Sequence, residues 1–262
     1  MPAAAMVQSE RTFRDFIPPR PPAALYDVNQ GRAKSPTCKP HDHSLSEGLD
    51  GETMRQVDGL VTARIRLRTG QTLFRAGDRF TSLYWIRSGS FKSVSLLQAG
   101  YEQVAGYHMQ GEIIGADGIG NDSHGCEAVA LEDSEVCSLP FERIEALSRQ
   151  NSGFQRNLHR LLSREIARAR SVAMLLGTMH ADQRLGAFLL DLSQRYQARG
   201  YSSCEFVLRM TRAEIASYLG LTLETVSRSF SRFHNDGLLQ VERRLVKLLD
   251  QPSLKRLVEC SN

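Results

Sequence analysis

The 262-residue chain lacks the features that mark several large classes of protein. It has no run of about 18 consecutive apolar residues, so we expect no membrane-spanning helix and no membrane partner. The first residues, MPAAAMVQSERTFRDF, contain no apolar stretch of the length that a secretory signal needs, which predicts a cytoplasmic protein. Neither GxSxG nor HExxH occurs, and no phosphate-binding glycine loop precedes a predicted helix. The sequence therefore does not indicate an enzyme.

Cysteine is also scarce. The five cysteines are scattered along the chain: Cys38, Cys126, Cys137, Cys204 and Cys260. An odd number without regular spacing argues against a disulfide framework. Charged residues make up 24% of the chain and hydrophobic residues 41%, which is typical of a folded globular protein. The formal charge of +4 permits a nucleic-acid partner without requiring one.

Two regions of different texture make up the first half of the chain. Seven of the nine prolines lie between Pro2 and Pro40, and because proline fixes φ and removes a donor, residues 1–54 are predicted to be a flexible arm. Residues 55–150 then alternate apolar and polar side chains between closely spaced glycines. This pattern predicts a small β sandwich or jelly roll that would serve as a sensor barrel.

The periodicity changes after Pro140, where FERIEALSRQ predicts a short helix and residues 152–178 a long one. Apolar side chains in the long helix alternate at three- and four-residue steps, which is typical of a coiled-coil seam. We interpret residues 151–180 as a dimerisation helix with a seam formed by Leu162, Ile166, Ala169, Ala173 and Leu176. The alternative is a monomer in which this helix is buried against its own barrel.

The last region, residues 181–262, contains the stretch TRAEIASYLGLTLETVSRSFSRFHNDGL. Thr211 can cap one short helix, Gly220 permits a sharp turn, and Thr222 can cap a second helix. Two short helices joined in this way predict a helix-turn-helix, and the two short strands of GLLQVERRLVKLL predict a wing. The expected fold class is therefore α+β, with a β jelly roll, a long helix and a C-terminal winged helix-turn-helix.

A helix-turn-helix inserts the exposed face of its second helix into the major groove. Here that face carries Glu224, Ser227 and Arg228, and arginine and glutamate have the donors and acceptors that base edges require. Three other arginines are candidates for phosphate contacts: Arg212, Arg243 and Arg244. The alternative is an ordinary surface helix, since Glu224 and Arg228 also have the spacing of an intrahelical ion pair.

Across about residues 55–250 the sequence resembles the Crp-Fnr family of bacterial transcription regulators, and within it the Fnr subgroup. The blocks TGQTLFRAGD, LYWIRSGSFKS and MTRAEIASYLGLTLETVSRSFSRF carry the resemblance in order and spacing. The resemblance implies a cyclic-nucleotide-binding-like barrel and a homodimer on double-stranded DNA. It also implies that Glu224, Ser227 and Arg228 read TTGAT-type half-sites and that the protein controls genes in response to oxygen or redox state. RNA polymerase is an expected further partner, through which the protein could act as an activator; whether it activates or represses its genes stays open.

The same resemblance allows two cofactors to be considered. Cyclic-nucleotide members hold the ribose with a Glu after Gly, as at Gly111-Glu112, and the phosphate with an Arg. The corresponding phosphate position, near residues 124–126, has no Arg, and an anionic phosphate would lose its best charge-assisted partner there. We therefore do not expect cyclic AMP to bind.

Oxygen-sensing Fnr proteins hold a [4Fe-4S] cluster with three N-terminal cysteines and one in the barrel. Cys38 and Cys137 stand at two of these positions, but the other two N-terminal cysteines are absent, and such a cluster normally takes four thiolates. His41 and His43 could substitute, or could belong to a solvated arm, and Cys137 could be a small buried strand residue. The sequence thus leaves open whether an iron-sulfur cluster binds.

Oxygen-sensing members also carry an acidic residue in the seam at the position of Ala169. Two like charges facing each other in a dimer repel, so its absence predicts a dimer that persists with or without a cofactor. A second interpretation is a relative that responds to haem, nitric oxide or a small ligand, or that is constitutive. Its candidate ligands are His108, His124 and His159, each also readable as an ordinary surface or packing histidine.

Overall fold

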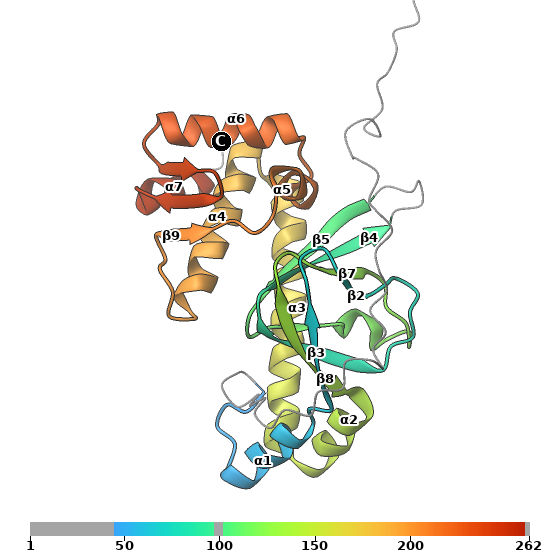
Figure 1. The fold of residues 1–262 in the computed structure, drawn as a ribbon. Coiled ribbons are helices and arrows are strands. Elements are labelled where there is room, and N and C mark those ends of the chain that lie inside the picture. Colours follow the sequence, from blue (N-terminus) through green and yellow to red (C-terminus); the bar gives the residue numbers. More distant parts are fainter. Residues whose placement is uncertain (1–44, 97–101, 260–262) are drawn as a thin grey trace, which may run out of the picture.

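The computed structural model describes residues 45–96 and 102–259, and every element below lies in this part of the chain (Figure 1). No helix within these ranges combines the length and the apolar character needed to cross a membrane. Figure 1 shows the long helix α3 running beside a β barrel, with a separate helical unit at its far end.

The barrel contains eight strands: β1 (Ala63–Leu67), β2 (Thr72–Phe74), β3 (Ser82–Ser88), β4 (Ser90–Leu96), β5 (Glu102–Met109), β6 (Ile113–Ile114), β7 (Glu127–Ala130) and β8 (Ser134–Pro140). They form two antiparallel sheets with the orders β1-β8-β3-β6 and β2-β7-β4-β5, and a short 3-10 turn, η3 (Ala116–Gly118), follows β6. Strands that alternate between two sheets in this way define a jelly roll. The predicted barrel architecture is confirmed.

The interior of the barrel explains why the strand pattern folds this way. Alternate side chains of both sheets meet there, and Ile65, Ile86, Phe91 and Val136 are all almost completely buried. The β3–β4 turn depends on Gly89, whose φ is 86°. A Cβ atom at this position would lie 2.1 Å from the hydroxyl oxygen of Ser134, so only glycine fits.

Two helices close the end of the barrel farthest from the C-terminal unit: α1 (Gly51–Gly59) and α2 (Phe141–Gln150). The predicted arm, residues 1–54, overlaps the described chain from residue 45, and there it is packed. Asn157 donates hydrogen bonds to the carbonyl oxygens of Leu45, at 3.1 Å, and Glu47, at 2.9 Å. The proline content that suggested an arm ends before this segment. Cys38, His41 and His43 lie outside the described residues.

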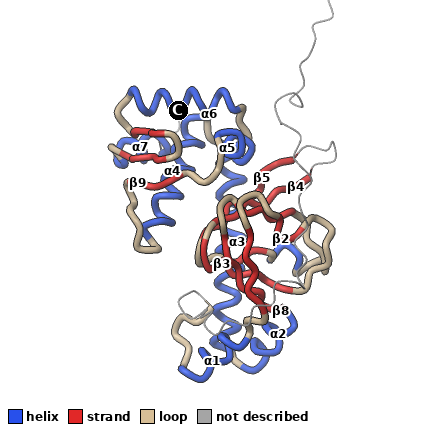
Figure 2. The backbone as a smooth tube through the Cα atoms, in the orientation of Figure 1, coloured by secondary structure: helices blue, strands red, loops and turns tan. Residues whose placement is uncertain are grey.

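Helix α3 spans Ser152–Thr178, as the sequence predicted. Its first half is buried against the barrel through Phe154, Leu158 and Leu161. Its second half is different, because Ile166 is 62% exposed and Met174 68% exposed. The tube view shows this second half extending past the strands towards the C-terminal helices (Figure 2).

The C-terminal unit contains α4 (Ala181–Gln197), β9 (Glu205–Val207), α5 (Arg212–Leu219), α6 (Leu223–Asn235), β10 (Leu239–Glu242), β11 (Leu245–Leu248) and α7 (Gln251–Glu259). The strands form a sheet in the order β10-β11-β9, so the predicted winged helix-turn-helix is confirmed. Helix α7, which the sequence analysis did not predict, packs on α4, where Leu254 and Val258 lie against Gly186.

The barrel and the C-terminal unit share apolar packing. Val104, Tyr107 and Met109 of β5 belong to the same buried cluster as Leu185 and Phe188 of α4. Buried apolar area is the main favourable term in folding, so this shared cluster holds the unit against the barrel.

Candidate nucleic-acid interface

Local capping fixes where the two helices of the helix-turn-helix begin and end. Thr211 and Glu214 form a capping box at the start of α5, with each side chain accepting from the other residue's backbone N–H. Gly220 ends α5 in the left-handed region, with φ 61°. Thr222 then caps α6 by accepting from the N–H of Thr225 at 3.1 Å. The predicted caps and turn are all confirmed.

The buried face of α6 determines which side chains point outwards. Val226, Phe230 and Phe233 are at most 4% exposed and pack into the core of the C-terminal unit. The opposite face therefore faces solvent, and the structure places Glu224, Ser227 and Arg228 together on it, all exposed. The Ser227 hydroxyl donates to the carbonyl of Leu223 at 2.9 Å and keeps its acceptor lone pairs available.

The three candidate phosphate ligands differ in their surroundings. Arg243 and Arg244 are exposed at the turn between β10 and β11, where Arg243 adopts a φ of 57°. Arg212 instead lies over the ring of Phe230, with 3.1 Å between the guanidinium carbon and the ring centroid. Burial lowers the pKa of Arg212 to about 10. Arg243 and Arg244 are thus available at the surface, whereas Arg212 also has a packing contact.

Two further residues orient this surface, and the sequence analysis missed both. Asp182, in the first turn of α4, forms an ion pair with Arg232 of α6 and accepts from Ser229 at 2.5 Å. Arg184 binds three backbone carbonyls: Leu176 at 2.8 Å, Met179 at 2.8 Å and Leu219 at 3.1 Å. These contacts join the ends of α3 and α5. They depend on tertiary packing, and no local motif signals them.

The predicted dimer seam lies along the outer side of α3. Ile166, Ala169 and Ala173 are exposed in the single chain, while Leu162 and Leu176 are partly buried. An exposed apolar row of this kind on a long helix is the surface that a partner helix covers in a coiled coil.

The barrel position where cyclic-nucleotide relatives bind phosphate already holds a carboxylate. One oxygen of Asp117 accepts from the backbone N–H of Gly125, at 2.7 Å, and of Cys126, at 3.2 Å. The other lies 3.5 Å from Nδ1 of His124. A phosphate approaching these amides would meet the negative charge of Asp117, which disfavours binding. Burial raises the pKa of Asp117, but these hydrogen bonds outweigh it and lower the pKa overall.

Glu112, the residue considered above as a ribose ligand for a cyclic nucleotide, already has other partners. Its carboxylate is 8% exposed and forms ion pairs with Arg168, Arg195 and Arg199. These three arginines come from α3 and from the α4 region rather than from the barrel.

The described cysteines do not form a set of metal ligands. Cys137 is fully buried in β8, among Leu83 and Trp85, and its sulfur is in a disulfide bond rather than a free thiol. Cys126 donates to Asp117 at 3.4 Å, and burial together with the Asp117 charge raises the pKa of its thiol to about 12. Within residues 45–96 and 102–259, no three His, Cys, Asp or Glu side chains gather into a metal site. These residues by themselves do not fit a four-thiolate cluster.

The three histidine candidates are also spread over separate elements. His108 lies in β5 and is hydrogen bonded to Ser93 at 3.1 Å, and burial lowers its pKa to about 4. His124 is 3% exposed and stacks on Phe74, with 3.7 Å between ring centroids. His159 is exposed on α3. His124 thus has the contacts of a packing side chain and His159 those of a surface side chain.

The exposed, capped α6 beside a basic wing defines a winged-helix DNA-binding protein with an appended jelly-roll barrel. Comparison with known proteins agrees with this class. A cyclic nucleotide-binding domain family matches residues 64–151, and a Crp-like helix-turn-helix domain family matches residues 183–257.

Individual relatives extend the match to most of the chain. "Transcriptional regulatory protein btr" of Bordetella pertussis is 47% identical over 80% of this chain and 87% of its own. "Fumarate and nitrate reduction regulatory protein" of Escherichia coli is 39% identical over 86% of this chain and 93% of its own. The structure of FixK2 from Bradyrhizobium japonicum, 27% identical, superposes with a TM-score of 0.71 over 77% of this chain and 100% of its own. The chain belongs to the Crp-Fnr family of DNA-binding transcription regulators.

Proposed function

We propose that this protein is a homodimeric transcription regulator that binds TTGAT-type palindromes. The observation that carries the proposal is the joint exposure of Glu224, Ser227 and Arg228 on one face of a capped recognition helix. An arginine can donate two hydrogen bonds to guanine, and a glutamate can accept from cytosine. Arg243 and Arg244 in the wing, and Arg212 at the start of α5, would bind backbone phosphates and fix the register.

The apolar row on α3 supports dimerisation. Leu162, Ile166, Ala169, Ala173 and Leu176 lie on a helix whose second half projects beyond the barrel. A second copy of α3 in parallel would cover this row and pair the two recognition helices, as a palindrome requires.

The signal is proposed to be oxygen or redox state, on the basis of the Fnr-type DNA-reading helix and the named relatives. Because the described residues do not fit a [4Fe-4S] cluster by themselves, no step is assigned to such a cluster. Cys38 and Cys137 would be its protein ligands only together with other donors, and only if the disulfide bond that holds the Cys137 sulfur were reduced. The second candidate is a regulator that is constitutive or responds to haem, nitric oxide or another small ligand. The absence of an acidic residue at Ala169 supports a dimer that persists without any cofactor.

The protein would act in the cytoplasm, where it meets DNA and RNA polymerase. The test is binding of anaerobically purified protein to a duplex with a TTGAT palindrome, with an absorbance spectrum, before and after exposure to air. Loss of binding in air, together with loss of a visible absorbance band, supports a cluster-dependent oxygen sensor. Equal binding in both states supports the constitutive alternative. A protein that binds the palindrome no better than a scrambled duplex in either state contradicts the proposed DNA target.

A further inference from the structure

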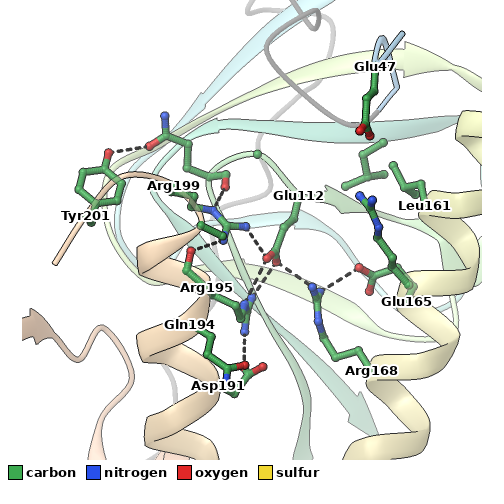
Figure 3. Close-up of a pocket in the computed structure, with 15 residues that line it drawn as sticks. Glu47, Glu112, Leu161, Glu165, Arg168, Asp191, Gln194, Arg195, Arg199 and Tyr201 are labelled. Atoms are coloured by element: carbon green, nitrogen blue, oxygen red, sulfur yellow. Dashed lines mark hydrogen bonds and ion pairs between the residues drawn. The ribbon is translucent and has the colours of Figure 1, made fainter. Parts of the chain in front are cut away.

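A cleft of about 830 Å³ lies where the barrel, α3 and α4 meet (Figure 3). Its lining includes four arginines and four carboxylates, so the formal charges around the cleft balance. Glu112 lies among the arginines, in the turn between β5 and β6.

The Glu112 carboxylate contacts three guanidinium groups with both of its oxygens. Arg195 is bidentate, with Nε 3.2 Å from one oxygen and Nη2 2.7 Å from the other. Arg199 donates to the first oxygen at 2.6 Å, and Arg168 to the second at 3.4 Å. Bidentate and charge-assisted bonds of this kind are the strongest and most directional that side chains make.

The two arginines of the α4 region also bind the barrel backbone. Nη2 of Arg195 donates to the carbonyl of Tyr107 at 2.7 Å, and Nε of Arg199 donates to that of Gln110 at 2.5 Å. Both guanidinium groups are therefore held by β5 and the β5–β6 turn, and α4 cannot rotate against the barrel without breaking several of these bonds.

The position of α4 matters because α4 carries the DNA-reading helices. Only residues 179–180 separate α3 from α4, and Asp182 and Arg184 of α4 bind α6 and the end of α5, respectively. Arg168 of α3, the proposed dimerisation helix, forms an ion pair with the same Glu112 carboxylate. One buried side chain of the barrel thus contacts both helices that set where the recognition helix lies.

The energetics favour keeping this cluster intact. Glu112 is 8% exposed, and an isolated carboxylate at that depth would be strongly destabilised by loss of hydration. Removing one partner of a buried ionic cluster leaves the others uncompensated, so the cluster exists in full or the interface opens.

We propose that Glu112 is a positioning residue for DNA recognition. It anchors α4 to the barrel and to α3 so that the two recognition helices of a dimer have the separation that a palindrome needs. This inference rests on the proposed dimer on a palindromic site. Glu112 touches no DNA, so its effect should appear only where two half-sites are bound together.

The experiment measures binding of Glu112→Gln to two duplexes, one with a single TTGAT half-site and one with the full palindrome, by fluorescence anisotropy. Glutamine keeps the shape and removes the charge. We expect the affinity for the half-site to stay within about twofold of that of the unmodified protein. The affinity for the palindrome should be at least about tenfold weaker, because the two DNA-binding units of the dimer no longer bind both half-sites at once. The matched control is Asp191→Asn, which removes a partner of Arg195 that lies on α4 itself. It should bind both duplexes normally.

Equal loss on both duplexes would overturn the proposal, because it would mean that Glu112 supports the folding of the DNA-reading unit itself. Unchanged binding to the palindrome would overturn it as well. If Glu112→Gln does not fold, Arg199→Gln takes its place under the same criteria. The Arg199 side chain is more exposed than that of Glu112, and its replacement removes only one ion pair of the cluster. Failure of the unmodified protein to prefer the palindrome would instead contradict the proposed function, on which the inference depends.

Discussion

Lys92 of β4 forms an ion pair with Glu214 of α5, although the two residues are 122 positions apart in the sequence. The Lys92 side chain is 9% exposed and that of Glu214 20% exposed. Glu214 is also the residue that completes the capping box of α5. A barrel strand therefore holds the first turn of the helix-turn-helix directly.

This ion pair predicts a marked loss of stability when only one partner is removed. We expect Glu214→Gln to lower the free energy of unfolding by about 3–5 kcal/mol, because Lys92 is left as a buried charge and the cap is weakened. Urea denaturation measures the change. The double variant Lys92→Met with Glu214→Gln should recover part of the loss, and a double variant as unstable as the sum of the two single variants would contradict the interaction.

Stability should also depend on pH through His108. The folded state holds the pKa of His108 at about 4, below its ordinary value of 6.5, because burial disfavours the charged ring. The unfolded state binds a proton more readily between these values, so stability is complete above about pH 6.5 and falls as the pH drops towards 4. Unfolding free energies at pH 7 and pH 5 should differ less in His108→Gln. An equal difference in both proteins would assign the effect to other groups.

Buried carboxylates should extend this acid sensitivity. Burial raises the pKa of Glu112 and of Glu214, but the neighbouring arginines and Lys92, respectively, outweigh it and lower both pKa values below 4.5. A carboxyl group whose pKa is lower in the folded state than in the unfolded state stabilises the fold at pH values above its unfolded-state pKa. This stabilisation is lost as the pH falls through the folded-state pKa. We expect urea midpoints to keep falling below about pH 4.5, and less steeply in Glu112→Gln. An identical slope in that variant would show that Glu112 does not contribute.

Replacing Arg228 tests the base contact. Arg228→Ala should weaken binding to the TTGAT palindrome by about 1–3 kcal/mol and relax discrimination at one base pair, as expected for loss of a bidentate contact. Competition between duplexes that differ at single positions measures this. A uniform loss on every sequence would make Arg228 a phosphate ligand. Arg243→Ala is the comparison, and it should weaken all duplexes alike.

The seam on α3 is tested by introducing a charge. Ala169→Asp would place two carboxylates opposite each other in a symmetric dimer, and we expect a lower dimer fraction in sedimentation. The control is Arg170→Asp, which also introduces an aspartate on α3 but at an exposed position outside the seam. An unchanged profile for Ala169→Asp would refute the seam.

Thiol reactivity should separate two cysteines. Cys126 has its pKa raised to about 12 by burial and Asp117, whereas Cys204 is exposed. Because the thiolate is the reactive form, alkylation at pH 8 should label Cys204 well before Cys126. Peptide mass spectrometry follows both sites in one sample. Faster labelling of Cys126 would contradict its contact with Asp117.

Local sequence determined the elements of this protein to a large extent. Caps at Thr211 and Thr222, the turn at Gly220 and the alternation within the strands act over a few residues, so they could be predicted. The exposed trio on α6 followed from the same helical periodicity, because the positions of Val226, Phe230 and Phe233 fix the opposite face.

Tertiary structure alone decided what these elements do together. No local pattern indicates that Glu112 faces three arginines, that Asp117 occupies the amides beside His124, or that Arg184 joins α3 to α5. Each of these contacts joins residues on separate elements or loops, and its energy depends on burial and geometry that exist only once the chain has packed. Sequence therefore determined which helix can read DNA, and the packed structure decided how that helix is held.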